Sequence, residues 1–129
     1  MTSPSPVTDL LSHSAAYSTD NGAAYLGDSR DLLGELPSNS IDLVVTSPPF
    51  ELAHQKEYGD DWDEDDQDYQ SWFLEFAEEV KRVLAPHGSF VIEIGGAFNK
   101  GEPSRSTYQF ELLTKLTNEE MDLKVGQDF

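Results

Sequence analysis

The 129-residue sequence is strongly acidic, with 25 Asp and Glu against 8 Lys and Arg and a formal net charge of −17. This charge argues against a free-standing nucleic-acid binder, because phosphate contacts need Lys and Arg. It fits a solvated surface, adaptation to high salt in a halophilic source, or a basic partner. Cysteine is absent, which excludes disulfides, thiolate metal sites and a cysteine nucleophile. Without an apolar run of membrane-spanning length or a secretory leader, a cytoplasmic protein is expected.

The first half of the chain predicts a loose start followed by alternating elements. Residues 1–19 are rich in Ser, Thr and Pro and predict a flexible tail, and residues 20–129 predict part of one domain. The segment "AAYLGDS" predicts a short strand that ends at Gly27-Asp28. The segment "SRDLLGELPSNS" predicts a helix, because its leucines have helical spacing and a proline ends it.

A second strand follows in "SIDLVVTSPPF", where the continuous apolar run from Leu43 to Val45 predicts a strand buried on both faces of a parallel sheet. The next segment, "KEYGDDWDEDDQ", is a dense run of carboxylates. Such a run is typical of a solvated loop, and it lacks the ligand spacing of a calcium loop. No metal site is therefore predicted.

The second half predicts two helices and a strand. "DYQSWFLEFAEEVKRVLAPHG" has an apolar stripe at three-four spacing, stopped by a proline and a glycine. "GSFVIEIGG" predicts a buried strand with Glu93 near its end, and "STYQFELLTKLTNEEM" predicts a helix with Tyr108, Leu112 and Leu116 on one side. "DLKVGQDF" predicts the beginning of another strand. The alternation of strands and helices predicts an α/β fold, part of a doubly wound, mainly parallel sheet that is incomplete in this chain.

Ligands bind at the carboxyl ends of the strands in such sheets, and "TSPPF" lies at one of these ends. Its two prolines fix φ and donate no N–H, while Ser47 adds a hydroxyl and Phe50 an aromatic face. This combination predicts an acceptor-rich pocket beside a stacking surface, which suits a planar group with an exocyclic amine, such as a nucleobase. A plain Pro-Pro strand terminator is the alternative.

The stretch "VVTSPPF" resembles motif IV of the DNA amino-methyltransferases, (Asp/Asn/Ser)-Pro-Pro-(Tyr/Phe). Its serine form resembles the N4-cytosine enzymes of restriction–modification systems. The resemblance extends through "YLGDS", "WFLEFAEEVKRVLAPHGSFVIEIGGAF" and "KGEPSRSTYQFELL". It implies a Rossmann-like methyltransferase, with S-adenosylmethionine as methyl donor and double-stranded DNA as substrate. N6-adenine methylation and a non-catalytic fragment that completes another chain remain alternatives, whereas an acidic DNA mimic leaves "TSPPF" unexplained.

The resemblance also implies roles for the residues of the site. The Ser47 side chain and the Pro48 carbonyl would accept hydrogen bonds from the cytosine amine, Pro49 would stiffen the turn, and Phe50 would stack on the flipped base. Glu93, on the neighbouring strand, would accept a proton or orient the Ser47 hydroxyl. A solvated carboxylate at a strand end is the alternative for Glu93.

Two further residues are implied to approach the cofactor. Asp28 would meet the adenine amine of S-adenosylmethionine and Ser29 would follow it, while an N-capping role is the alternative for Asp28. The Gly-rich cofactor motif Phe-x-Gly-x-Gly does not occur in the sequence. The family includes a circularly permuted arrangement, with Ser-Pro-Pro first, the DNA-recognition region next and the cofactor motif last. The resemblance covers only the first part of that arrangement. We therefore expect an N-terminal portion, truncated before the DNA-recognition and cofactor-motif regions, with exposed apolar strands and a complementary C-terminal half as partner.

Overall fold

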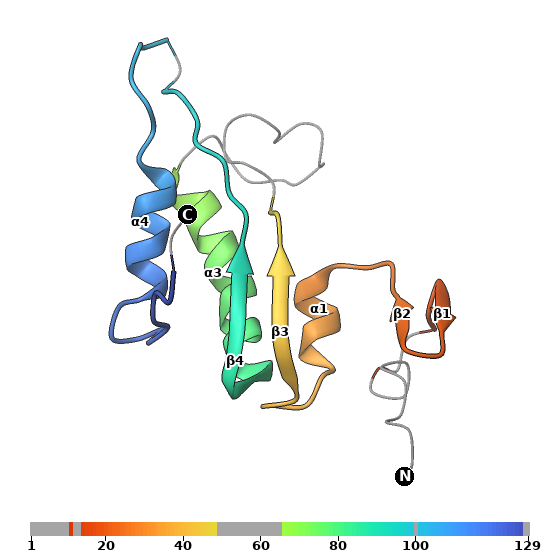
Figure 1. The fold of residues 1–129 in the computed structure, drawn as a ribbon. Coiled ribbons are helices and arrows are strands. Elements are labelled where there is room, and N and C mark those ends of the chain that lie inside the picture. Colours follow the sequence, from red (N-terminus) through yellow and green to blue (C-terminus); the bar gives the residue numbers. More distant parts are fainter. Residues whose placement is uncertain (1–10, 12–13, 49–65, 100, 128–129) are drawn as a thin grey trace.

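The computed structural model describes residues 11, 14–48, 66–99 and 101–127 (Figure 1). Its elements, in chain order, are β1 (Tyr17–Thr19), β2 (Gly22–Ala24), α1 (Ser29–Gly34), β3 (Ile41–Thr46), α3 (Asp66–Val83), β4 (Leu84–Ile92) and α4 (Tyr108–Leu116). Strands β3 and β4 pair in parallel, joined through α3, while β1 and β2 form a separate antiparallel hairpin. The expected α/β fold with parallel pairing is confirmed. Within the described ranges, no helix has the length and hydropathy needed to cross a bilayer.

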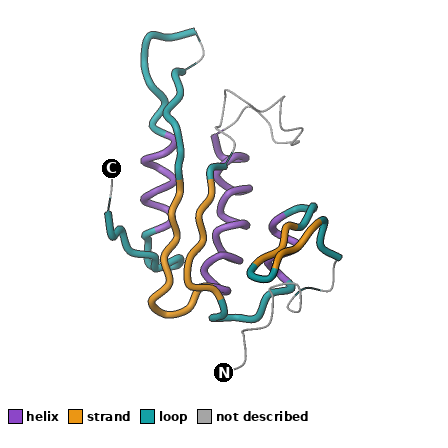
Figure 2. The backbone as a smooth tube through the Cα atoms, turned by 45° about the vertical axis from the view of Figure 1, so that its right-hand side comes forward, coloured by secondary structure: helices purple, strands orange, loops and turns teal. Residues whose placement is uncertain are grey.

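The described helices cover one face of the parallel pair. Helix α3 contacts α1, α4 and β4. Figure 1 shows the two strands side by side with α3 behind β4, and in the turned view of Figure 2 α3 stands clear of the strands. Val44 is opposite Phe90 in the strand register, and Val45 is opposite Val91. The Phe90 ring packs against Phe76 of α3, with 6.1 Å between centroids. Because successive residues of a strand point to opposite faces, Val44 and Phe90 face the helices and Val45 and Val91 face away.

The core lies between α3 and α4. Tyr69 and Tyr108 are fully buried, and their rings meet edge to face at 5.5 Å. Phe73 is fully buried beside them and Leu112 is nearly so. The apolar stripes predicted for these two helices are thus confirmed as core. Burial of large aromatic side chains stabilises this pair of helices more than any polar contact between them.

The opposite face of the sheet is apolar and open. Leu43, Val45 and Val91 are 56%, 66% and 47% exposed. The prediction that this strand is buried on both faces is therefore wrong for the described residues. An apolar run is the pattern of a strand enclosed by two helix layers, and only one of these layers is described here. The exposed apolar surface expected of an incomplete sheet is confirmed at these three residues.

Two strand predictions fail at the margins of the domain. Strand β2 ends at Ala24, so the expected strand does not reach Asp28, and β2 pairs with β1, the last three residues of the expected tail. A hairpin partner is local in sequence, whereas a parallel strand requires a distant neighbour. Residues 122–127 also form no strand. The N–H of Leu123 instead donates to Leu116 O at the end of α4, at 3.2 Å, which directs the segment along the helix layer.

Candidate active site

The carboxyl ends of β3 and β4 bring Ser47 and Glu93 together. The strands end at the paired residues Thr46 and Ile92, and the N–H of Glu93 donates to Thr46 O at 2.9 Å. The ladder therefore continues one residue past the strands, which makes Ser47 and Glu93 the next positions in register. Both side chains are exposed. Both belong to the set of alternate strand positions that face away from the helices. The prediction that the Glu93 strand lies next to the Ser-Pro-Pro strand is confirmed.

The turn after β3 is anchored on one side and open on the other. Pro48 is buried while Ser47 is exposed, so the rigid ring of Pro48 holds the backbone and the hydroxyl remains accessible. Pro49 and Phe50 lie outside the described residues. A hydroxyl oxygen and a carboxylate are hydrogen-bond acceptors, so this edge offers acceptors to a ligand that brings N–H donors.

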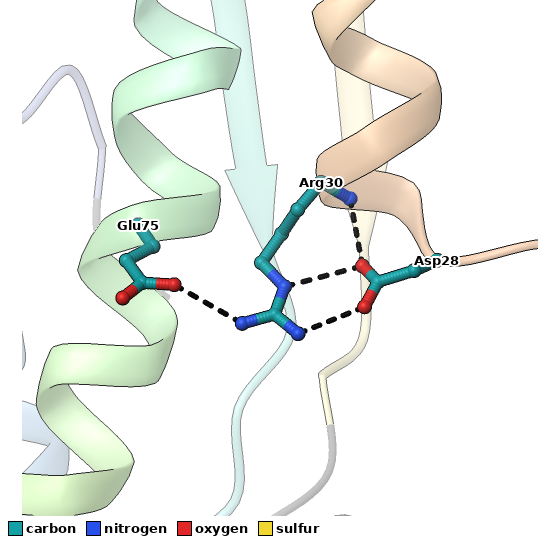
Figure 3. A network of polar contacts seen from close by, with 3 residues as sticks. All are labelled: Asp28, Arg30 and Glu75. Atoms are coloured by element: carbon teal, nitrogen blue, oxygen red, sulfur yellow. Dashed lines mark hydrogen bonds and ion pairs between the residues drawn. The ribbon is translucent and has the colours of Figure 1, made fainter.

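Asp28 caps helix α1, as Figure 3 shows. Its Oδ1 accepts from the backbone N–H of Arg30 at 2.9 Å, and its Oδ2 accepts from Arg30 Nη2 at 2.8 Å. Arg30 Nε also donates to Asp28 Oδ1 at 3.2 Å, and the third guanidinium nitrogen, Nη1, donates to Glu75 Oε2 of α3 at 3.1 Å. The side-chain hydrogen bond from Arg30, followed by its backbone N–H, lowers the pKa of Asp28. The capping alternative for Asp28 is confirmed, and the cofactor role stays a prediction.

The first turn of α1 nevertheless lies at the ligand edge. The helix runs antiparallel to β3, so its start lies toward the end at which β3 terminates (Figure 1). Ser29, the first residue of the helix, is exposed there. The local sequence does not predict the role of Arg30, whose guanidinium links this edge to α3 through Glu75. Its partner Glu75 is 45 positions away, and no local pattern relates two residues at that separation.

The ion pair predicts a pH-dependent contribution to stability. We expect Asp28→Asn, which keeps an N-capping oxygen, to lower the free energy of unfolding at neutral pH by about 0.5–1 kcal/mol, since the pair is partly exposed. The folded-state pKa of Asp28 lies below its unfolded value, so the contribution is complete above the unfolded pKa. It is lost as pH falls through the folded value, below about pH 4.

Urea unfolding of both proteins over a pH series measures this difference. Asp20→Asn, which removes the same charge from the exposed turn between β1 and β2, is the matched control. A difference between Asp28→Asn and the unmodified chain that stays constant down to acid pH would contradict the assignment, because it could not come from a charge.

Comparison with known proteins gives a consistent result. The DNA methylase family (N6_N4_Mtase) matches residues 41–128. The type II methyltransferase M.PvuII of Proteus hauseri is 46% identical over 114 residues, covering 88% of this chain. M.SfiI of Streptomyces fimbriatus is 37% identical over 103 residues and covers 74% of it. The solved structure titled PvuII DNA methyltransferase (cytosine-N4-specific) superposes with a TM-score of 0.72 at 46% identity over 86% of the chain.

The match is to part of each relative. This chain spans 33% of the length of M.PvuII, 24% of M.SfiI and 38% of the solved chain. The matched portion includes the parallel strands, the helices between and after them, and the edge that carries Ser47 and Glu93. By the extent of the family match, the chain belongs to the DNA methylases of the N6/N4 group.

Proposed function

We propose that this chain is the amine-binding portion of a DNA methyltransferase that methylates the exocyclic N4 amine of a flipped cytosine. The observation that carries the proposal is the continuation of the parallel ladder, which makes the hydroxyl of Ser47 and the carboxylate of Glu93 neighbours at the ligand edge. The cytosine-N4 specificity of the solved relative supports cytosine over adenine as the target. A purely structural fragment would not require two exposed acceptors at this edge.

The chemistry follows from the amine. The lone pair of the cytosine N4 amine is delocalised into the ring, which makes the nitrogen a poor nucleophile. In the proposed mechanism, the Ser47 hydroxyl oxygen and the Pro48 carbonyl accept hydrogen bonds from the two amine N–H groups. Acceptors held at this position favour the geometry in which the lone pair is free to react, and because the turn is rigid they need no rearrangement. Phe50 would stack on the base, and Pro49 would keep the turn extended.

The carboxylate of Glu93 completes the proposed proton path. The amine must lose one proton when its nitrogen gains a methyl group. Glu93 is exposed and next in register to Ser47, so it can accept that proton or orient the Ser47 hydroxyl. The route needs no covalent enzyme intermediate, which agrees with a sequence that has no cysteine.

S-adenosylmethionine is the proposed methyl donor. When bound, it supplies an electrophilic methyl group whose transfer to the amine nitrogen leaves S-adenosylhomocysteine and releases one amine proton. The residues present fit the adenine end of this molecule: the Asp28 side chain is 42% exposed, and its Oδ2 accepts one hydrogen bond among the described residues. A carboxylate oxygen has room for a second donor. Asp28, with Ser29 beside it, would therefore accept a hydrogen bond from the adenine amine while keeping its ion pair with Arg30.

The open sheet face supports a further part of the proposal, a complementary polypeptide. Leu43, Val45 and Val91 form a continuous apolar surface on adjacent strands, and parallel sheets are normally covered by helices on both faces. We propose that the region corresponding to the remaining length of the relatives covers this face and supplies the cofactor motif and the basic DNA-contacting surface. We propose that the assembled enzyme acts on double-stranded DNA in the cytoplasm.

A complementation experiment tests the function. The chain is combined with the part of the Proteus hauseri relative that lies outside the match, together with labelled S-adenosylmethionine and double-stranded DNA. Digestion to nucleosides should yield N4-methylcytosine. N6-methyladenine would identify the rival activity. An assembled complex that gives neither product would refute a catalytic role, and tight S-adenosylmethionine binding with methylation by the chain alone would refute the need for a complement.

Replacing Glu93 with glutamine tests the proton path. The amide keeps the size of the side chain but cannot take a proton, so we expect turnover in the complemented assembly to fall by about 10²-fold with little change in DNA affinity. Single-turnover methyl transfer and a DNA titration measure the two quantities. Glu119→Gln, in the exposed turn that follows α4, is a control of equal charge. Unchanged turnover in the Glu93 variant would show that Glu93 is a solvated carboxylate at the end of the strand with no role in proton transfer.

A further inference from the structure

A projecting hairpin joins β4 to α4 and carries an aromatic–arginine pair. Residues 97–99 and 101–106, here called the β4–α4 hairpin, contain an antiparallel bridge between Phe98 and Arg105. Figure 1 shows this segment rising past the arrowhead of β4 before it returns to α4. It therefore extends beyond the carboxyl edge at which Glu93 lies.

Hydrogen bonds make the hairpin an ordered structure. The N–H of Asn99 donates to Ser104 O at 2.8 Å, and the N–H of Ser106 donates to Ala97 O at 2.7 Å. The Asn99 side chain also donates to Ser104 Oγ at 2.9 Å. Gly101, near the tip, has φ of +75°, a conformation that other residues adopt only with strain. Such a scaffold keeps side chains at its base in defined positions.

The base of the hairpin is anchored to the core. The Tyr108 hydroxyl donates to Gly95 O, and the Tyr108 N–H donates to Ser106 Oγ at 3.2 Å. Tyr108 is fully buried between α3 and α4. The orientation of the hairpin is therefore determined by the same side chain that packs the two helices, and it is coupled to the end of β4.

The side chains that this scaffold presents are suited to nucleic acid. Phe98 is 59% exposed, Arg105 is exposed, and the Arg105 guanidinium carbon lies 4.8 Å from the centre of the Phe98 ring. The aromatic face orients the planar guanidinium, and because a guanidinium has five N–H donors, an exposed arginine held in this way can still donate to a ligand. An arginine on an aromatic face is a common element of surfaces that bind the backbone and bases of nucleic acids.

The charge of Arg105 is available to a ligand. The other two arginines in the described ranges are held by carboxylates: Arg30 by Asp28 and Glu75, and Arg82 by Glu79. Arg105 forms no ion pair with a described residue. The nearby carboxylate of Glu102 accepts the Ser104 hydroxyl at 3.0 Å. The chain has a net charge of −17 and repels phosphate overall. An arginine that no described carboxylate neutralises makes the electrostatic potential near it less negative, so phosphate can approach there.

We propose that the β4–α4 hairpin is a DNA-contacting element in which Arg105 binds a backbone phosphate beside the target base and Phe98 positions the guanidinium. The proposal rests on the proposed DNA methyltransferase function, which brings duplex DNA to this edge, and it specifies a contact that the function alone does not assign. Phosphate contacts set the register of DNA on a protein without reading its sequence. The hairpin would thus align the flipped base with Ser47 for any target sequence.

DNA binding by the complemented assembly tests this inference. The assembly, in which only this chain is isotope-labelled, is titrated with a short DNA duplex at low salt, and the amide shifts of Phe98 and Arg105 are followed by NMR. We expect Arg105→Gln to weaken binding about tenfold and to lower the slope of log affinity against log salt by about one. Arg105→Lys should keep the slope. Lys81→Gln, which removes one positive charge in the last turn of α3 at the opposite edge of the sheet, should change neither quantity.

The outcomes separate this inference from the proposed function. Equal binding by Arg105→Gln and Lys81→Gln, or an absence of hairpin shifts, overturns the hairpin contact even where the complemented assembly methylates DNA. Weaker binding by Arg105→Gln in an assembly without methyl transfer supports the contact and refutes the function. Phe98→Leu keeps apolar bulk but removes the ring face, so in the assembly it should weaken DNA binding when Arg105 is present and have no further effect beside Arg105→Gln.

Discussion

Replacing Ser47 with alanine is expected to lower the rate of methyl transfer by about 10²–10³-fold in the complemented assembly while leaving DNA affinity nearly unchanged. The hydroxyl oxygen is proposed to accept a hydrogen bond from the amine as its lone pair becomes reactive, so its loss raises the barrier more than it weakens the ground state. The side chain is exposed at the end of β3, so the substitution should not disturb packing. Single-turnover transfer of a labelled methyl group measures the effect.

Ser40→Ala is the matched control for this experiment. Ser40 precedes β3 at the opposite end of the strand, and its hydroxyl donates to Pro37 O at 2.6 Å. Its removal should alter stability slightly and methyl transfer not at all. A Ser47→Ala assembly with an unchanged single-turnover rate would refute the acceptor role and would favour the simpler interpretation of Ser-Pro-Pro as a strand terminator.

Glutamate substitutions at two adjacent residues of β3 should differ greatly in their effect on stability. Val44→Glu directs a carboxylate toward the helix layer, because Val44 is opposite Phe90, which packs against Phe76. We expect it to lower the free energy of unfolding by about 3 kcal/mol, as an unpaired charge is forced into an apolar layer. Val45→Glu directs the same group to the open face, where Val45 is 66% exposed, and should change stability by about 0.5 kcal/mol or less. Urea unfolding of the chain alone measures both.

If the open face is a docking surface, Val45→Glu should be the variant with the larger effect on association with the complement, although it has the smaller effect on the stability of the chain alone. In the complemented assembly, Val45→Glu should weaken association by about 10²-fold or more, since the charge would be buried against the complement without a partner. Equal damage by both substitutions in the chain alone would show that the open face is already covered in solution. Sedimentation velocity would then show whether a second copy of the chain covers it.

The elements inside the helix layer were predictable from sequence because their signals are local. Tyr108, Leu112 and Leu116 recur at helical spacing, and all three are buried in α4. The stripe of α3 contributes Tyr69 and Phe73 to the same core. Spacing of three and four residues is a property of the helix itself, so it identifies the buried face without knowledge of what covers it.

The strands were less predictable because their partners are distant. "AAYLGDS" has strand-like composition, but only Ala23 and Ala24 of it join β2, which pairs with β1. "DLKVGQDF" has similar composition, but its described residues pass beside α4, where Leu123 bonds to Leu116. Whether an apolar segment becomes a strand depends on a neighbour with free backbone groups. That neighbour is a tertiary property.

The residues of the candidate site divide in the same way. Residue types and their places along the chain predict the proposed chemistry: Ser47, Pro48 and Glu93 follow apolar runs, and residues after parallel strands lie at the ligand edge. Which of them lie close together depends on the fold, through the register in which Thr46 pairs with Ile92. The fold also places Asp28 against Arg30 and Arg105 against the Phe98 ring, with no ion pair from Arg105 to a described residue. The physical reason is that residue type and local period set what a side chain can do, whereas pairing across the fold sets what it can reach.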